Sequence, residues 1–210
     1  VHSFSFRLSQ EIHAAYIEIY PENPPHFAPE KSILTPMKTK ISQPYYCLFF
    51  ALLFALCYWL NENILTAICW ACFCSLLFAI SVVDGYYRLI SPALCQNLFA
   101  LGLGAAYWQI TPLTLKQSLQ SAVIFFAVFS LIYYGAKWYY KQEAFGRGDC
   151  WLALGLGAFF SYEQLPAFLL LACLSGLVYA LYGKLNKRYL TTIPFGPFLS
   201  LSGVLCRLLN

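Results

Sequence analysis

Residues 64–84 read ILTAICWACFCSLLFAISVVD, and this stretch indicates the kind of fold to expect. Its polar groups before the last residue are the hydroxyls of Thr66, Ser75 and Ser81, and Asp84 is its one charged residue. About 20 consecutive apolar residues are enough for an α-helix to cross the hydrocarbon core of a bilayer. The stretch therefore predicts a membrane helix that ends in a carboxyl group. Such a group is costly beside hydrocarbon unless it is neutralised, paired or hydrated, so Asp84 is a candidate functional residue.

The composition of the whole chain is that of a membrane protein. The chain is 60% hydrophobic and 10% charged, whereas soluble domains carry about 25% charged residues. The net charge of +4 comes from basic residues that lie between apolar runs and form no continuous patch. We therefore expect membrane lipid as a partner and no nucleic acid.

The chain divides after Pro44 into a polar and an apolar part. Residues 1–44 contain five prolines between Pro21 and Pro36, which break any long helix, so we expect a short cytoplasmic segment. Residues 45–210 predict an all-α transmembrane domain, a polytopic helix bundle. Its seven predicted helices are 45–60, 64–83, 89–110, 119–140, 149–160, 165–182 and 193–209. The fifth is too short for a bilayer of normal thickness, so it requires a thinned membrane or cover from other helices.

The basic residues give this bundle an orientation. With residues 1–44 in the cytoplasm and the helices alternating in direction, only Lys116 and Arg207 of the 13 Lys and Arg residues fall outside. Basic residues concentrate on the cytoplasmic side of membrane proteins. Without the short fifth helix, Lys184, Lys187 and Arg188 would also fall outside, so the fifth helix is retained.

Asp84 and Asp149 are the only two aspartates in the chain, and this topology places both at cytoplasmic helix ends. A bundle can bring two such ends together as a carboxyl dyad. Two carboxyl groups held close together are expected to share one proton near neutral pH, so that one activates water while the other polarises an amide carbonyl. A serine nucleophile is a poorer alternative, because the apolar part has no histidine to act as its base. The structural alternative is that each aspartate simply ends a helix.

Gly146 and Gly148 lie just before Asp149, and we expect this segment to bind substrate. Glycine adopts backbone conformations closed to other residues and lets another chain approach closely. The alternative is an ordinary glycine-rich turn before a helix. The following LGLG sequence at 154–157 predicts close packing between helices.

We expect no metal site. Cys69, Cys72 and Cys74 are the densest group of the nine cysteines, but they lie within a predicted membrane helix, and all three histidines lie in residues 1–44. A cysteine in such a helix commonly serves as a small buried hydrophobe.

Three motifs follow one another along the apolar part: DGYYRLISP at 84–92, GRGDCWLALG at 146–155 and IPFGPFL at 193–199. In order, spacing and topology they resemble the motifs of the type IV prepilin peptidases, which are membrane aspartic proteases of the G-x-G-D type. The resemblance covers residues 45–210. Ser91, which stands before Pro92, is a small departure from the first motif.

The resemblance implies an endopeptidase of the bacterial inner membrane that removes the basic leader from prepilins or pseudopilins at the cytoplasmic face. It implies Asp84 and Asp149 as the catalytic pair, with Gly146 and Gly148 shaping the site. It implies no cofactor for proteolysis, and S-adenosylmethionine for those members that also methylate the new amino terminus. The segment Pro194–Pro197 matches a family signature and is interpreted as the entry to the last helix.

Residues 1–44 depart from the family pattern, because they contain neither a further apolar helix nor the two C-x-x-C pairs of many members. This reduced segment leaves methylation open. One alternative function is a non-catalytic membrane component of a pilus or type II secretion system, although both aspartates are intact. Another is a proton-coupled carrier, but carriers place their carboxyl groups near the midplane and show internal repeats.

Overall fold

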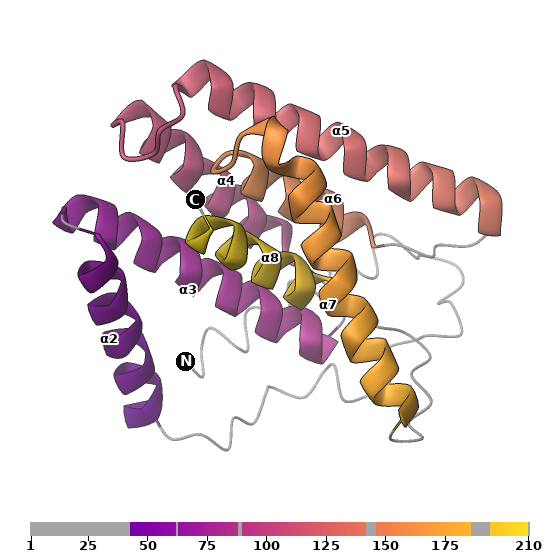
Figure 1. Ribbon diagram of the computed structural model, residues 1–210, viewed down its shortest axis with the longest axis horizontal. Helices are drawn as coiled ribbons and strands as arrows, with labels where there is room; N and C mark the ends of the chain where they lie inside the picture. The colour runs from indigo at the N-terminus through magenta and orange to yellow at the C-terminus, as the bar shows by residue number, and fades with distance from the viewer. Residues whose placement is uncertain (1–42, 62, 88–89, 142–145, 186–193, 210) are drawn as a thin grey trace. The chain divides into compact units, whose positions relative to one another are not determined.

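The computed structural model describes residues 43–209 except 62, 88–89, 142–145 and 186–193 (Figure 1). Every regular element in these ranges is helical, which confirms the all-α fold class. The prediction for residues 1–44 falls almost entirely outside the described residues. The α-helices are α2 (Gln43–Leu60), α3 (Ile64–Tyr87), α4 (Pro92–Tyr107), α5 (Leu115–Tyr140), α6 (Arg147–Gly157), α7 (Leu165–Leu185) and α8 (Gly196–Leu208), with the short 3-10 helix η2 (Tyr162–Gln164) before α7.

Within the described residues, three helical segments are long and apolar enough to cross a membrane: Ile64–Gly85, Leu115–Tyr139 and Tyr162–Leu185. They correspond to the predicted spans 64–83, 119–140 and 165–182. Two more apolar helices, Cys47–Leu60 and Gly196–Leu208, are shorter. The predicted fifth helix is also a helix, but it covers the 11 residues Arg147–Gly157 and not 149–160. Asp149 is therefore its third residue and not its first.

The chain forms two compact units, Val1–Ala51 and Leu52–Asn210. The described part of the first unit is the beginning of α2. Both aspartates and the contacts described below belong to the second unit.

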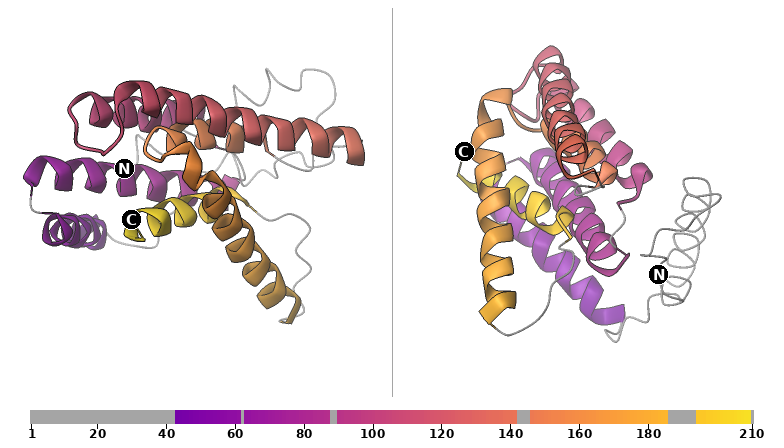
Figure 2. Two further views of the ribbon diagram at one scale, coloured as in Figure 1. Left: turned by 45° about the horizontal axis from the view of Figure 1, so that its top comes forward. Right: turned by 90° about the vertical axis from the view of Figure 1, so that its right-hand side faces the viewer.

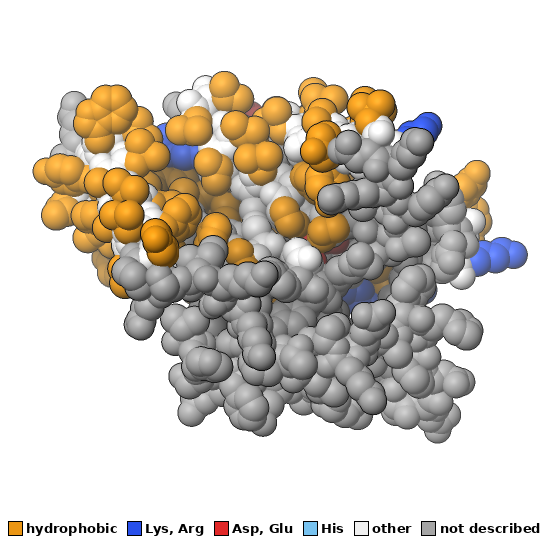
Figure 3. Space-filling model, turned by 90° about the horizontal axis from the view of Figure 1, so that it is seen from below, with side chains coloured by type: hydrophobic (Ala, Val, Ile, Leu, Met, Phe, Trp, Pro, Cys, Tyr) orange, Lys and Arg blue, Asp and Glu red, His pale blue; other side chains and the backbone are white. Residues whose placement is uncertain are grey.

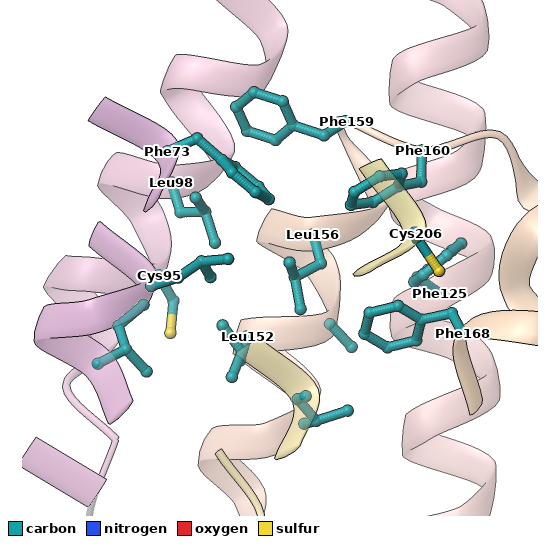
Figure 4. Close-up of a cluster of buried hydrophobic side chains, with 14 of the residues drawn as sticks. Phe73, Cys95, Leu98, Phe125, Leu152, Leu156, Phe159, Phe160, Phe168 and Cys206 are labelled. Carbon is teal, nitrogen blue, oxygen red and sulfur yellow. The ribbon is translucent and has the colours of Figure 1, made fainter. Parts of the chain in front are cut away.

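Helix α6 lies at the centre of the second unit, in contact with α4, α5 and α8. Its side chains Leu152, Ala153 and Leu156 are completely buried. Figure 4 shows Leu156 between Phe73 on one side and Phe125 and Phe168 on the other. The short apolar helix is thus enclosed by its neighbours, as its length requires.

The glycines of the LGLG sequence allow this close packing. A Cβ atom added at Gly157 would lie 2.8 Å from Ala122 Cα in α5, and one added at Gly155 would lie 3.0 Å from Leu98 Cδ2 in α4. Contacts shorter than ordinary van der Waals distances would force the helices apart. The predicted role of this sequence in helix packing is confirmed.

Two buried serines of α5 hold the far end of α6. Ser118 Oγ donates to the carbonyl oxygen of Ala158 at 2.7 Å, and Ser121 Oγ accepts from the backbone N–H of Tyr162 at 3.0 Å. These hydrogen bonds satisfy backbone groups that the end of a helix leaves without partners. They fix α6 along α5 and so fix the level at which Asp149 lies.

Helix α8 packs against both α3 and α7 (Figure 2). On α8, a Cβ atom added at Gly203 would lie 2.9 Å from Leu156 Cδ2, so α8 also approaches α6 closely. This packing places the first residue of α8 beside the last turn of α3, where Asp84 lies.

The outer surface of the described helices is apolar. Figure 3 shows hydrophobic side chains over much of the described part of one face. Large exposed hydrophobic residues include Leu131 and Trp138 on α5 and Leu177 and Val178 on α7. Apolar surface on this scale is unfavourable in water and suits contact with lipid.

Candidate active site

Asp84 lies in the last turn of α3, and its side chain is only 5% exposed. The helix around it is apolar, so the carboxyl group finds its partner on another element. The backbone N–H of Gly196, the first residue of α8, donates to Asp84 Oδ2 at 2.8 Å. Asp84 therefore does more than end a helix: it joins α3 to α8 at a buried point.

Asp149 lies in the first turn of α6 and is also only 5% exposed. Gly146 precedes the helix with an extended backbone (φ −76°, ψ 135°) and accepts a hydrogen bond from the Asp149 N–H at 3.2 Å. The backbone of Gly146 also interacts with the Asp149 carboxyl group. Asp149 Oδ1 is buried and has no hydrogen-bond partner among the described residues.

The structure places the two carboxyl groups close enough to interact electrostatically. The charge of Asp84 on α3 acts on the carboxyl group of Asp149 on α6, and both side chains are buried. Two carboxyl groups in such a setting cannot both ionise cheaply, which favours a state with one shared proton. Such an electrostatic interaction is what the predicted carboxyl dyad requires.

The two glycines before Asp149 act by close packing and not by unusual backbone angles. Among the described residues no glycine has a positive φ, so the expectation of backbone conformations closed to other residues is wrong at these positions. A Cβ atom added at Gly148 would lie 2.7 Å from Ile90 Cβ, and one added at Gly146 would lie 3.0 Å from Asp149 Oδ2. The segment is thus packed against the first motif and against its own aspartate.

Two residues of the site were not predicted. Gly196 belongs to a motif that was interpreted only as a helix entry, yet its N–H contacts Asp84. Tyr133 on α5 is buried and accepts a hydrogen bond from Arg147 Nε at 2.9 Å. The Gly-Pro pair at 196–197 could have indicated Gly196, whereas nothing in the sequence distinguished Tyr133 from the chain's other tyrosines.

The cysteine group differs in part from the prediction. Cys69 is buried and Cys74 is partly buried, but Cys72 is exposed, because it lies on the outward face of α3. The part of the chain that the structure describes contains no group of three or more His, Cys, Asp or Glu side chains placed to hold a metal ion.

Fold and site together define a helical membrane protein with a buried pair of carboxyl groups, the arrangement of a membrane aspartic peptidase. The chain belongs to the type IV leader peptidase family, whose profile matches residues 71–181 and so includes both aspartates. This family processes the leader peptides of type IV prepilins, which confirms the predicted family and its peptidase activity.

Individual relatives agree with this assignment. The chain is 40% identical over 204 residues to a prepilin leader peptidase/N-methyltransferase of Haemophilus influenzae, a match that covers 96% of this chain and 86% of that protein. It is 36% identical over 128 residues to a type 4 prepilin-like proteins leader peptide-processing enzyme of Escherichia coli, covering 61% of this chain and 46% of that protein. No solved structure gives a significant match.

Proposed function

We propose that Asp84 and Asp149 are the catalytic pair of this leader peptidase. The observation that carries the proposal is the electrostatic interaction between two buried carboxyl groups from separate helices. With one proton between them, one carboxylate takes a proton from water while the other, as a carboxylic acid, donates to the scissile carbonyl oxygen. Water oxygen bonds to the carbonyl carbon, and the C–N bond then breaks as the amine takes a proton.

Gly146 and Gly148 serve in this proposal as the segment against which the substrate backbone lies. Their lack of side chains keeps the backbone before Asp149 close to Ile90 and to the carboxyl group itself. A substrate amide must lie against this same stretch to reach both acids. The segment is therefore proposed as the substrate-binding part of the site.

The substrates we propose are type IV prepilins or pseudopilins with a basic leader, cut at the cytoplasmic face of the bacterial inner membrane. Seven helices crossing that membrane would place both aspartates on the cytoplasmic side. Support comes from the ends of α5 and α6, where Lys137 and Arg147 both lie over the Tyr133 ring at 5.9 Å from its centroid. The predicted cytoplasmic ends of these two helices thus meet, with basic residues at both.

A second reaction, methylation of the new amino terminus, is suggested by the name of one relative. Its methyl donor would be S-adenosylmethionine, which the name of the Haemophilus relative as an N-methyltransferase suggests. Among the described residues, the buried polar atoms without a partner are Thr111 Oγ1, Asp149 Oδ1 and Ser200 Oγ. They lie after α4, in α6 and in α8 and do not together form a site that fits this cofactor.

The experiment is leader removal from a prepilin co-expressed in a peptidase-deficient strain, measured by mass spectrometry of the pilin. The unaltered protein should remove the leader, whereas Asp84→Ala and Asp149→Ala should each abolish removal. Glu163→Ala is the matched control. Glu163 is an exposed acid in η2, so the variant protein should remove the leader normally. Cleavage by either aspartate variant would end the proposal. The same spectra report any added methyl group separately.

A further inference from the structure

The first turn of α8 directs one N–H group at Asp84. Gly196 opens the helix and its N–H contacts Asp84 Oδ2, while Pro197, the next residue, has no N–H. The N–H groups of Phe198 and Leu199 both donate to the carbonyl oxygen of Phe195, each at 3.1 Å. Of the first four residues of α8, Gly196 is thus the one whose N–H bonds to a side chain in the described structure.

Position 196 leaves no room for a side chain. A Cβ atom added there would lie 2.7 Å from Asp84 Oδ2, 3.0 Å from its Cγ and 3.1 Å from its Cβ. Any residue other than glycine would push the carboxyl group away from the N–H. Glycine at this position therefore permits the hydrogen bond itself.

The two carboxyl groups are held differently. Asp84 Oδ2 accepts a backbone N–H at the positive end of a 13-residue helix, and both the hydrogen bond and the helix dipole stabilise negative charge. Asp149 also lies at the start of a helix and interacts with the Gly146 backbone, but its Oδ1 is buried and has no partner among the described residues, whereas neither oxygen of Asp84 is in that state. A protonated oxygen there would be a hydrogen-bond donor free to bind a substrate carbonyl.

We propose that Gly196 is a positioning residue that holds Asp84 as the ionised member of the pair, while Asp149 carries the shared proton. This inference rests on the proposed catalytic pair. Asp84 then takes a proton from the attacking water, and Asp149 gives its proton to the carbonyl oxygen. When the C–N bond breaks, Asp84 returns its proton to the amine, and a hydroxyl of the intermediate restores the proton of Asp149.

Two thiols among the described residues also interact with Asp149. They belong to Cys95 on α4 and Cys150 on α6, while Tyr179 on α7 packs against Phe198 of α8. The charged residue of α8, Arg207, lies at the opposite end of that helix, 4.4 Å from the Trp70 ring centroid. A thiol titrates at about pH 8.5 in a model peptide, so below that pH the cleavage profile should report mainly on the two aspartates.

The first test is the pH profile of Gly196→Ala. Loss of the N–H contact destabilises every state in which Asp84 is ionised. If Asp149 holds the proton, the inactive state with both acids protonated becomes more stable relative to the active state, in which Asp84 is ionised. The acidic limb of the profile therefore moves to higher pH by about one unit. The alkaline limb keeps its pH, because Asp84 is ionised both in the active state and in the state that has lost the second proton. Movement of the alkaline limb instead, or uniform loss of activity at every pH, overturns the inference.

Gly203→Ala is the matched control. It adds the same methyl group to the same helix, against Leu156 and away from Asp84. It should lower stability and leave both limbs at their original pH. A shift of the acidic limb in this variant as large as in Gly196→Ala would assign the effect to α8 packing, which also overturns the inference.

A second test uses the unaltered protein and stands even if Gly196→Ala does not fold. The chain has two Phe-Gly pairs, at 145–146 and 195–196. Labelling with carbonyl-13C phenylalanine and 15N glycine therefore selects the amides of Gly146 and Gly196, one beside each carboxyl group. Phe145→Leu removes the first signal and so assigns both.

The Gly196 amide signal should change with pH along the acidic limb of the cleavage profile, and the Gly146 signal along the alkaline limb. The reverse order, or identical titration of both amides, overturns the inference. If Asp84→Ala and Asp149→Ala still cleave prepilin, the catalytic pair itself is wrong. If both variants are inactive but the two amides titrate in the reverse order, the catalytic pair stands and only the assignment of the ionised and protonated members is wrong.

Discussion

Arg147 Nε donates a 2.9 Å hydrogen bond to Tyr133 Oη, and this contact joins the first residue of α6 to the buried face of α5. The guanidinium group also lies over the tyrosine ring, 5.9 Å from its centroid. Asp149 follows two residues later in the same helical turn. The position of one of the two acids therefore depends on a tyrosine of a neighbouring helix.

Tyr133→Phe should lower kcat for leader cleavage by about two- to tenfold, because it removes one hydrogen bond worth about 0.5–1.5 kcal/mol and keeps the ring. KM should change little, since the tyrosine acts through Arg147 and not through the substrate. The measurement is steady-state cleavage of a purified prepilin in detergent. Tyr134→Phe is the control, because Tyr134 is exposed. Equal loss in both variants would contradict the role of Tyr133.

The cleavage rate of the unaltered protein should show a bell-shaped pH profile. At low pH both acids are protonated and no base remains, whereas at high pH both are ionised and no acid remains. Activity therefore rises and then falls as the pH increases. The measurement is kcat/KM across the pH range, with Glu163→Gln as a control that should keep the profile. A rate that rises to a plateau with no alkaline decline would argue against a shared proton.

Gly148→Ala should lower leader cleavage at least tenfold, because the new methyl group would lie 2.7 Å from Ile90 Cβ and displace the segment before Asp149. Shortening the opposing side chain in the double variant Gly148→Ala, Ile90→Ala should restore part of the activity, as expected for residues in direct contact. Gly135→Ala is the control, because a Cβ atom there meets no atom within 4 Å. Strictly additive losses in the double variant would rule out this contact as the cause.

Gly157→Ala should destabilise the protein by about 1–3 kcal/mol, the usual cost of forcing a methyl group into a packed core. The added Cβ atom would meet Ala122 Cα and Phe125 Cβ, each at 2.8 Å. Gly104→Ala, whose nearest contact would be at 3.9 Å, should be neutral or slightly stabilising. Thermal unfolding in detergent, followed by circular dichroism, distinguishes the two. Equal melting temperatures would show that α5 and α6 adjust at no cost.

The helices could be predicted from the sequence because long apolar runs have few other solutions in a bilayer. Asp84 and Asp149 could be predicted because no other aspartate occurs in the chain and each stands beside hydrocarbon. The ends of the helices were less predictable. The start of α6 at Arg147 depends on the extended backbone of Gly146, which hydropathy does not report.

The contact between Gly196 and Asp84 could not be predicted, because it joins residues 112 positions apart and depends on how α8 packs against α3. The backbone conformations of Gly146 and Gly148 were misjudged for a related reason. A glycine that permits an unusual backbone angle and a glycine that permits close contact are the same letter in the sequence. Only the positions of Ile90 and the Asp149 carboxyl group distinguish the two.

The shortness of α6 has a consequence for how a prepilin reaches the two acids. Eleven residues make a helix of about 16 Å, roughly half of the hydrocarbon thickness, whereas the 26 residues of α5 extend about 39 Å. Arg147 at the start of α6 contacts Tyr133, seven residues before the end of α5, so if α5 spans the bilayer the start of α6 is recessed below the predicted cytoplasmic end of α5. The leader junction of the substrate must then unwind and dip into this recess, while the apolar stem behind it stays in lipid.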